Sequence, residues 1–111
     1  MAITTALLAA SPSANTIYSS TGNTAITTLI FCNTNQFNAG APTANTVTLT
    51  LHIVPNATSA GPGNMIVNQL PIPAGETFTF DTEKVILTQG DSVVAFASAA
   101  NLSAVISYMS V

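Results

Sequence analysis

The amino-acid sequence predicts an all-β protein: a single antiparallel β-sandwich of about seven strands with an extended N-terminal arm. Three observations predict this fold. Short runs rich in β-branched and aromatic residues recur about every 8 to 12 residues, clusters of Gly, Pro, Asn and Ser separate them, and no stretch has the apolar period of a helix. The 111 residues match the size of one domain. The patterns leave an Ig-like and a jelly-roll-like topology open.

The clearest strand is residues 46–54, with the sequence TVTLTLHIV. Successive side chains of a strand point to opposite faces, so its aliphatic residues share one face, and its threonines and histidine share the other. The aliphatic face comprises Val47, Leu49, Leu51 and Ile53. We therefore expect a central strand that buries this face in the core.

The other expected strands are shorter or less regular. Residues 25–33 carry apolar side chains on both faces, which predicts that both faces of this strand are covered. Phe78 and Phe80 alternate with threonines and are expected to point inward. The remaining strands are expected at residues 16–19, 65–72, 85–87, 92–99 and 102–111, the last two forming a closing hairpin.

We divide the chain into an N-terminal arm, residues 1–14, and a β-sandwich domain, residues 15–111. A Ser-Pro-Ser sequence at residues 11–13 interrupts the arm before a stable helix could form. Terminal segments are ordered only when something holds them, so we expect the arm to dock on its own domain or on a neighbouring molecule.

Four large hydrophobic residues outside the expected core are candidate interface residues. Three of them, Ile3, Leu7 and Leu8, make the arm partly apolar. The fourth, Phe37, is the one large hydrophobe in the loop of residues 34–45. It is expected either to contact a partner or to pack over the end of the sandwich.

Charge is scarce along the whole chain. Charged residues make up 5% of the sequence, against about 25% in an average globular protein, and the net charge is −3. A chain with one lysine and no arginine lacks the basic surface that nucleic acids or anionic membranes require. Soluble monomers usually carry interspersed charges, so we expect partners to cover much of this surface.

No residue pattern predicts catalysis, a cofactor or a metal site, and we expect the protein not to be an enzyme. Cys32 is the one cysteine and is expected to be a small hydrophobe in a strand. His52 is the one histidine and is expected at the surface or in an interface. Three acidic residues, Asp81, Glu83 and Asp91, lack the ligand spacing of a calcium loop. No run of about 18 apolar residues predicts a membrane span.

Several short motifs resemble small virion proteins of tailed bacteriophages. They follow one another along nearly the whole chain: TIY at 16–18, CN at 32–33, LHIVP at 51–55, PIPAGET at 71–77 and LTQGDSVVAFASAAN at 87–101. These motifs are turn and strand patterns. The resemblance implies a non-enzymatic structural subunit displayed on a capsid or a tail.

The resemblance and the sparse charge together favour a capsid decoration (cement) protein on the virion surface, assembled in the host cytoplasm. Its expected partners are the major capsid protein and further copies of itself, with a trimer as the expected assembly, because closed symmetry hides edge strands. Two alternatives remain: a receptor-binding module of a tail or head fibre, and a tail or neck adaptor. The absence of Trp, with Tyr18 and Tyr108 expected in strands, disfavours sugar binding by a fibre module.

Overall fold

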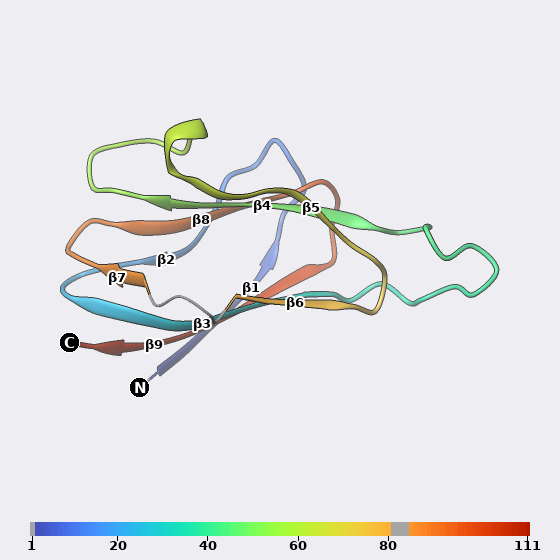
Figure 1. The fold of residues 1–111 in the computed structure, drawn as a ribbon, viewed down its shortest axis with the longest axis horizontal. Coiled ribbons are helices and arrows are strands. Elements are labelled where there is room, and N and C mark those ends of the chain that lie inside the picture. Colours follow the sequence, from blue (N-terminus) through green and yellow to red (C-terminus); the bar gives the residue numbers. More distant parts are fainter. Residues whose placement is uncertain (1, 81–84) are drawn as a thin grey trace.

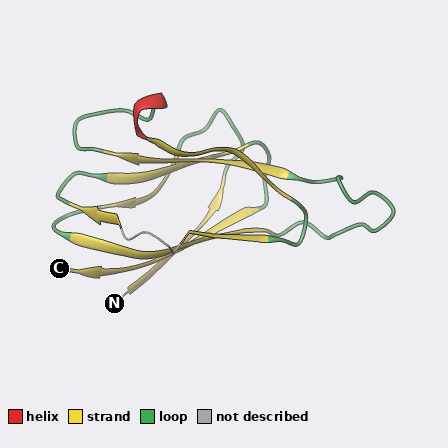
Figure 2. Ribbon diagram, viewed as in Figure 1, coloured by secondary structure: helices red, strands yellow, loops and turns green. Residues whose placement is uncertain are grey.

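Two antiparallel sheets pack face to face in the computed structural model, which describes residues 2–80 and 85–111 (Figure 1). The first, sheet A, contains β1 (Ala2–Leu8), β9 (Leu102–Ser110), β3 (Thr24–Asn33), β6 (Thr77–Phe80) and β7 (Val85–Leu87). The second, sheet B, contains β2 (Asn15–Ser19), β8 (Ser92–Ala97), β4 (Val47–Val54) and β5 (Met65–Ile72). One helical turn, η1 (Pro62–Asn64), interrupts the strands of the described chain (Figure 2). The predicted β-sandwich is confirmed.

The strand pairing is that of a jelly roll. The chain pairs like one long hairpin, β1 with β9, β2 with β8, β3 with β6 and β7, and β4 with β5. Rolling up this hairpin brings β9 beside β3 and β8 beside β4, which gives the orders β1-β9-β3-β6 and β2-β8-β4-β5. The structure thus decides between the two topologies that the sequence leaves open, in favour of the jelly roll.

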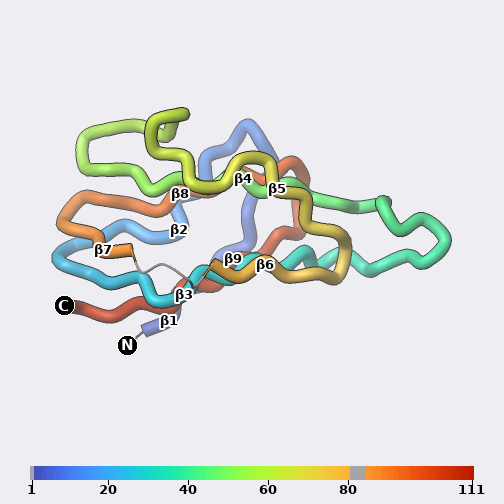
Figure 3. The backbone as a smooth tube through the Cα atoms, in the orientation of Figure 1, coloured from blue at the N-terminus to red at the C-terminus, as the bar shows by residue number. Residues whose placement is uncertain are grey.

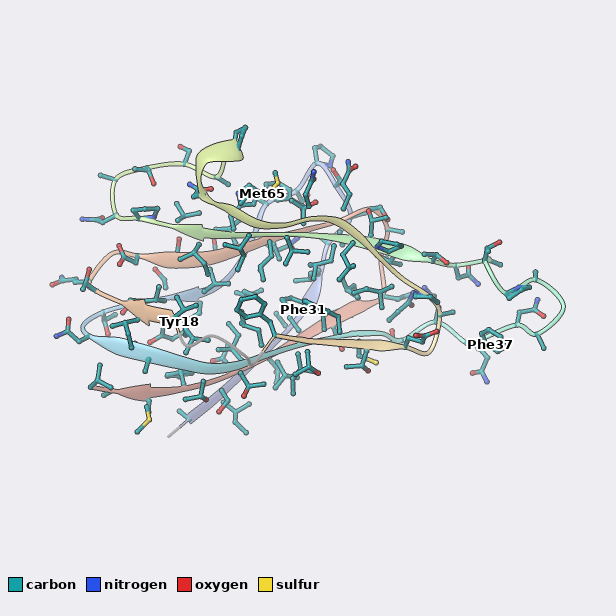
Figure 4. All side chains as sticks on the ribbon, viewed as in Figure 1. Tyr18, Phe31, Phe37 and Met65 are labelled. Carbon is teal, nitrogen blue, oxygen red and sulfur yellow. The ribbon has the colours of Figure 1, made fainter. Side chains whose placement is uncertain are left out.

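The core lies between the sheets and is built by the inward side chains of each strand. On β4, Val47, Leu49 and Leu51 are completely buried, as predicted for the aliphatic face. Phe31 on β3 is the largest side chain without solvent exposure, and Figure 4 shows it between the two sheets. Phe78 and Phe80 on β6 pack against the same core, which confirms their predicted direction.

The predicted closing hairpin of residues 92–99 and 102–111 is wrong. Strand β8 belongs to sheet B and β9 belongs to sheet A, so the chain crosses from one sheet to the other between Ala97 and Leu102. Alternating patterns locate both strands, but pairing between strands depends on the whole topology, which local sequence does not encode.

The first part of the predicted arm is a strand of the same domain. All seven residues of β1 pair with β9 without a register break, from Ala2 opposite Tyr108 to Leu8 opposite Leu102. The N- and C-terminal ends of the described chain therefore lie side by side (Figure 3). Of the two docking modes expected for the arm, the structure has the one on its own domain.

A corner at residues 9–14 carries the chain from sheet A to sheet B. The Asn15 side chain holds this corner because its amide oxygen accepts from Ala9 N at 2.9 Å and its amide nitrogen donates to Ala9 O at 3.1 Å. The same nitrogen lies 3.1 Å from Ala95 O on β8. The Asn15 side chain thus hydrogen-bonds both to Ala9, just after β1, and to β8, and so joins the end of β1 to sheet B.

At the opposite end, Asn33 fixes the start of the long loop of residues 34–46. This side chain is completely buried, and its amide nitrogen donates to Asn45 O and Ile72 O, both at 2.8 Å. Its amide oxygen accepts from Asn35 N at 3.0 Å. The loop projects beyond the sandwich (Figure 3), and Asn33 joins its two ends to β5.

Candidate interaction surface

His52 has a structural role in the loop that covers sheet B. Its side chain points away from the core, as predicted, but it is only 3% exposed, so the predicted surface position is wrong. Its Nδ1 atom lies 2.8 Å from Oδ1 of Asn64, the last residue of η1. The same Oδ1 accepts from Gly61 N at 3.0 Å, and the Asn64 amide nitrogen donates to Ser59 O at 2.9 Å. Because Oδ1 is an acceptor, His52 donates through Nδ1.

An aromatic contact completes the cover over sheet B. The His52 ring meets Phe96 of β8 edge to face, with ring centroids 5.6 Å apart. Val94, on the same strand and the same outer face, is also buried. Residues 55–64 and these side chains therefore shield one part of the outer face of sheet B from solvent.

Asp91 is committed to backbone hydrogen bonds between two loops. Its carboxylate accepts from Thr88 N and Asn56 N, each at 2.9 Å, and from the Thr88 hydroxyl at 3.1 Å. The two backbone N–H groups, of Thr88 and then Asn56, lower the pKa of Asp91 below its ordinary value of 3.8. Gly90 has φ +90°, and a side chain there would clash with the Asn56 side chain.

The described acidic residues do not form a cation site. Asp81 and Glu83, considered above with Asp91 as oxygen donors, lie outside the described residues. Within residues 2–80 and 85–111, no three side chains of His, Cys, Asp or Glu gather closely enough to hold a metal ion. The carboxylate of Asp91 already has three donors from the protein itself.

The outer face of sheet A is an open surface of the described chain that carries several exposed hydrophobic residues. We define it by the rows of cross-strand partners that point away from sheet B, because directly opposite residues share a face. One row runs Leu7, Ser103, Cys32, Thr77, and the next runs Thr5, Val105, Ile30, Thr79. The full set is Ile3, Thr5, Leu7, Ala25, Thr28, Ile30, Cys32, Thr77, Thr79, Ile86, Ser103, Val105, Ser107 and Met109.

Two properties distinguish this face from an ordinary protein surface. None of its residues is charged. Several large hydrophobic residues on it are exposed: Ile3 at 68%, Leu7 at 66%, Ile86 at 59% and Met109 at 39%. No described helix or strand lies across it (Figure 1). An uncharged surface with several exposed large hydrophobic residues is typical of an interaction site.

The four candidate interface residues fall into three environments. Ile3 and Leu7 lie together on the outer face of sheet A, four residues apart on β1. Leu8 points the other way and is 2% exposed in the core, so it is not available to a partner. Phe37 is 53% exposed on the projecting loop, far from β1 (Figure 4).

Sequence reasoning missed the contributions of β3, β7 and β9 to this surface. Ile30, Ile86, Val105 and Met109 were assigned to strands but not to an interface. The available signal was the two-sided apolar pattern of residues 25–33, which predicts that both faces are covered. Within the described chain, sheet B covers the inner face of β3, and its outward residues are buried or partly buried although no described helix or strand lies across them.

Cys32 contributes a small side chain to this face. It is partly exposed and lies opposite Ser103 on β9 and Thr77 on β6.

The two tyrosines face inward. Tyr18 and Tyr108 pack against the core with ring centroids 4.5 Å apart.

Comparisons of the chain with protein-family models, curated proteins and solved structures find no match. The resemblance to phage virion proteins therefore rests on the sequence motifs alone. Among the described residues, no helix has the length and apolar character needed to cross a membrane.

Proposed function

We propose that this protein is a non-enzymatic structural subunit of a bacteriophage virion, a capsid decoration protein that binds the outside of the major capsid protein lattice. One observation carries the proposal: the outer face of sheet A is open, uncharged and partly apolar. Such a face suits burial against a neutral protein surface, because no charge needs to be desolvated there. The sequence motifs indicate which kind of neighbour to expect.

In the proposed function, the protein stabilises the shell by adding contact area between neighbouring capsid proteins. Covering apolar surface contributes about 25 cal/mol per Å², and a standard specific interface buries about 800 Å² on each partner. A subunit that contacts two capsid proteins at once opposes their separation, so binding stabilises the assembled shell. Jelly rolls occur in many viral capsid proteins, although a fold alone does not set a function.

A depression on the outer face of sheet B favours a second candidate, a receptor-binding module of a tail or head fibre. It has a volume of about 230 Å³, and its lining includes Phe96 with the hydroxyl and amide side chains of Thr48, Thr50, Ser98 and Gln69. Neutral polar groups around an aromatic ring suit a sugar. However, both tyrosines face the core, which leaves few rings for sugar stacking.

The copy number per virion tests the proposal and separates its alternatives. The chain is quantified against the major capsid protein in purified particles of the phage that encodes it. Copies in simple proportion to the capsid protein support decoration. A few copies per particle indicate a fibre or an adaptor, and absence from the particle overturns the virion proposal.

Charged substitutions on the outer face of sheet A test whether this face binds the particle. Ile86→Lys with Met109→Lys places two ammonium groups on the outer face of sheet A, away from the β1 edge, and we expect particles lacking the protein to take up far less of this variant than of the wild type. Thr16→Lys, at an exposed position of edge strand β2 in sheet B, is the control and is expected to bind normally. Equal uptake of the double variant and the wild type would remove this face from the proposed interface.

A further inference from the structure

β1 is an edge strand that lacks the features by which proteins protect their edges. Natural edge strands carry charges, prolines or bulges that prevent pairing with another chain. β1 has the sequence AITTALL, with no charged residue and no proline, and its pairing with β9 has no register break. Its other side is unpaired in the described structure, since β1 stands at the end of the strand order of sheet A.

Both edges of sheet B have this protection. The pairing of β2 with β8 shifts register between Thr16 and Tyr18. The pairing of β5 with β4 shifts twice, and β5 contains Pro71 and a positive φ of 50° at Gln69. At the other edge of sheet A, β6 and β7 have only 4 and 3 residues, and very short strands are themselves a protection. β1 is therefore the one described edge strand that is regular over 7 residues and able to pair.

The sequence of β1 identifies its partner. A strand can pair with a second copy of itself in antiparallel fashion about a twofold axis, and Thr5 is the central residue of Ala2–Leu8. An axis at Thr5 pairs every residue of the strand, with Ile3 opposite Leu7, Thr5 opposite Thr5, and Thr4 opposite Ala6. The two most exposed large residues of β1 would then cover each other on the outer face of sheet A.

From this arrangement we infer that two copies of the chain pair through β1, antiparallel about a twofold axis at Thr5, and join their A sheets into one continuous sheet. Main-chain hydrogen bonds supply the contact, and the Ile3–Leu7 pairs fix its register. The two outer faces of sheet A become one uncharged surface of doubled area. The inference concerns the chain alone and does not depend on attachment to a capsid. It replaces the expected trimer with a dimer.

The test is the molar mass of the full-length protein in solution, measured by light scattering after size exclusion at concentrations from about 1 µM to about 1 mM. One chain has a mass of 11.3 kDa, and we expect twice that mass as the concentration rises. A monomer over the whole range, or a trimer, would overturn the inference.

Two matched variants locate the contact. Thr5→Lys brings two ammonium groups together at the axis, and we expect the monomer over the same range, with the melting temperature that the wild type has at concentrations too low for pairing. Thr16→Lys makes the same change on edge strand β2 and is expected to remain a dimer. If the Thr5→Lys variant is still a dimer, pairing through β1 is contradicted. The same holds if Thr16→Lys dissociates the dimer as completely as Thr5→Lys does.

Crosslinking tests the register. In a Cys32→Ser background, Thr5→Cys places two thiols opposite each other at the axis, and oxidation is expected to give a covalent dimer. Thr4→Cys, whose side chain points to the other face and lies opposite Ala6, is expected to remain uncrosslinked. Crosslinking at position 4 but not at position 5 would refute the axis at Thr5.

Discussion

The two outer faces of the sandwich differ in how far the chain itself covers them. On sheet B the chain folds over itself: residues 55–64 place Asn64 against His52, and His52 and Val94 are buried. On sheet A no described helix or strand lies across the face, and Ile3, Leu7 and Ile86 are each more than half exposed. The difference is that the chain covers part of the outer face of sheet B with its own residues, whereas no described helix or strand covers the outer face of sheet A.

Two adjacent leucines on β1 point to opposite faces, so their variants distinguish a core position from a position on the open face. Leu8→Ala is expected to lower the free energy of unfolding by about 2 to 5 kcal/mol, because Leu8 is 2% exposed in the core. Leu7→Ala removes the same atoms from a side chain that is 66% exposed in the single chain, and in dilute solution, where the chain is a monomer, we expect a change within about 0.5 kcal/mol. Urea denaturation of both variants measures the difference. Equal losses would mean that β1 is not held as described.

The cover of sheet B is tested at Asn64. Asn64→Ala removes the acceptor of His52 Nδ1 and of Gly61 N, and we expect a loss of about 1 to 3 kcal/mol in the free energy of unfolding. Asn68→Ala, at an exposed position on β5, is the control and should leave stability nearly unchanged. If both variants unfold alike, the Asn64 contacts do not hold the cover in place.

A smaller effect with a defined pH dependence is expected at Asp91. Its pKa is lower in the folded state than its ordinary value of 3.8, so its ionised form stabilises the fold above that pH, and this contribution is lost as the pH falls below it. Asp91→Asn places an amide N–H against a backbone donor and is expected to reduce stability at pH 7. Melting temperatures of the wild type and the variant should converge as the pH falls below 3.8. A difference that persists at low pH would exclude the carboxylate as its cause.

The strands were predictable from the sequence because alternation is a local property. The aliphatic face of β4 and the inward direction of Phe78 and Phe80 follow from a period of two alone. The pairing of β8 and β9 with strands of different sheets was not predictable, since it depends on contacts between distant parts of the chain.

Part of the candidate surface was predictable from local sequence, and part depended on the pairing of distant strands. Ile3 and Leu7 were identified in the arm, but Leu8 could be excluded only once the register of β1 on β9 was known. The buried roles of Asn33 and His52 depend on loops whose partners lie 12 or more residues away. The polar face of β4 predicts a surface or interface position for His52, and that pattern does not show that a loop of the same chain covers it.

The most direct test of the open face uses two methionines that lie on opposite sides of the sandwich. Met109 is exposed on the outer face of sheet A, whereas Met65 lies on β5 opposite His52, on the other side of the molecule. Peroxide oxidation of each methionine is measured by mass spectrometry in the isolated protein and in purified particles. We predict that Met109 is protected in the particle and that Met65 oxidises at the same rate in both. Protection of Met65 alone, or of neither methionine, would contradict the claim that sheet A faces the partner.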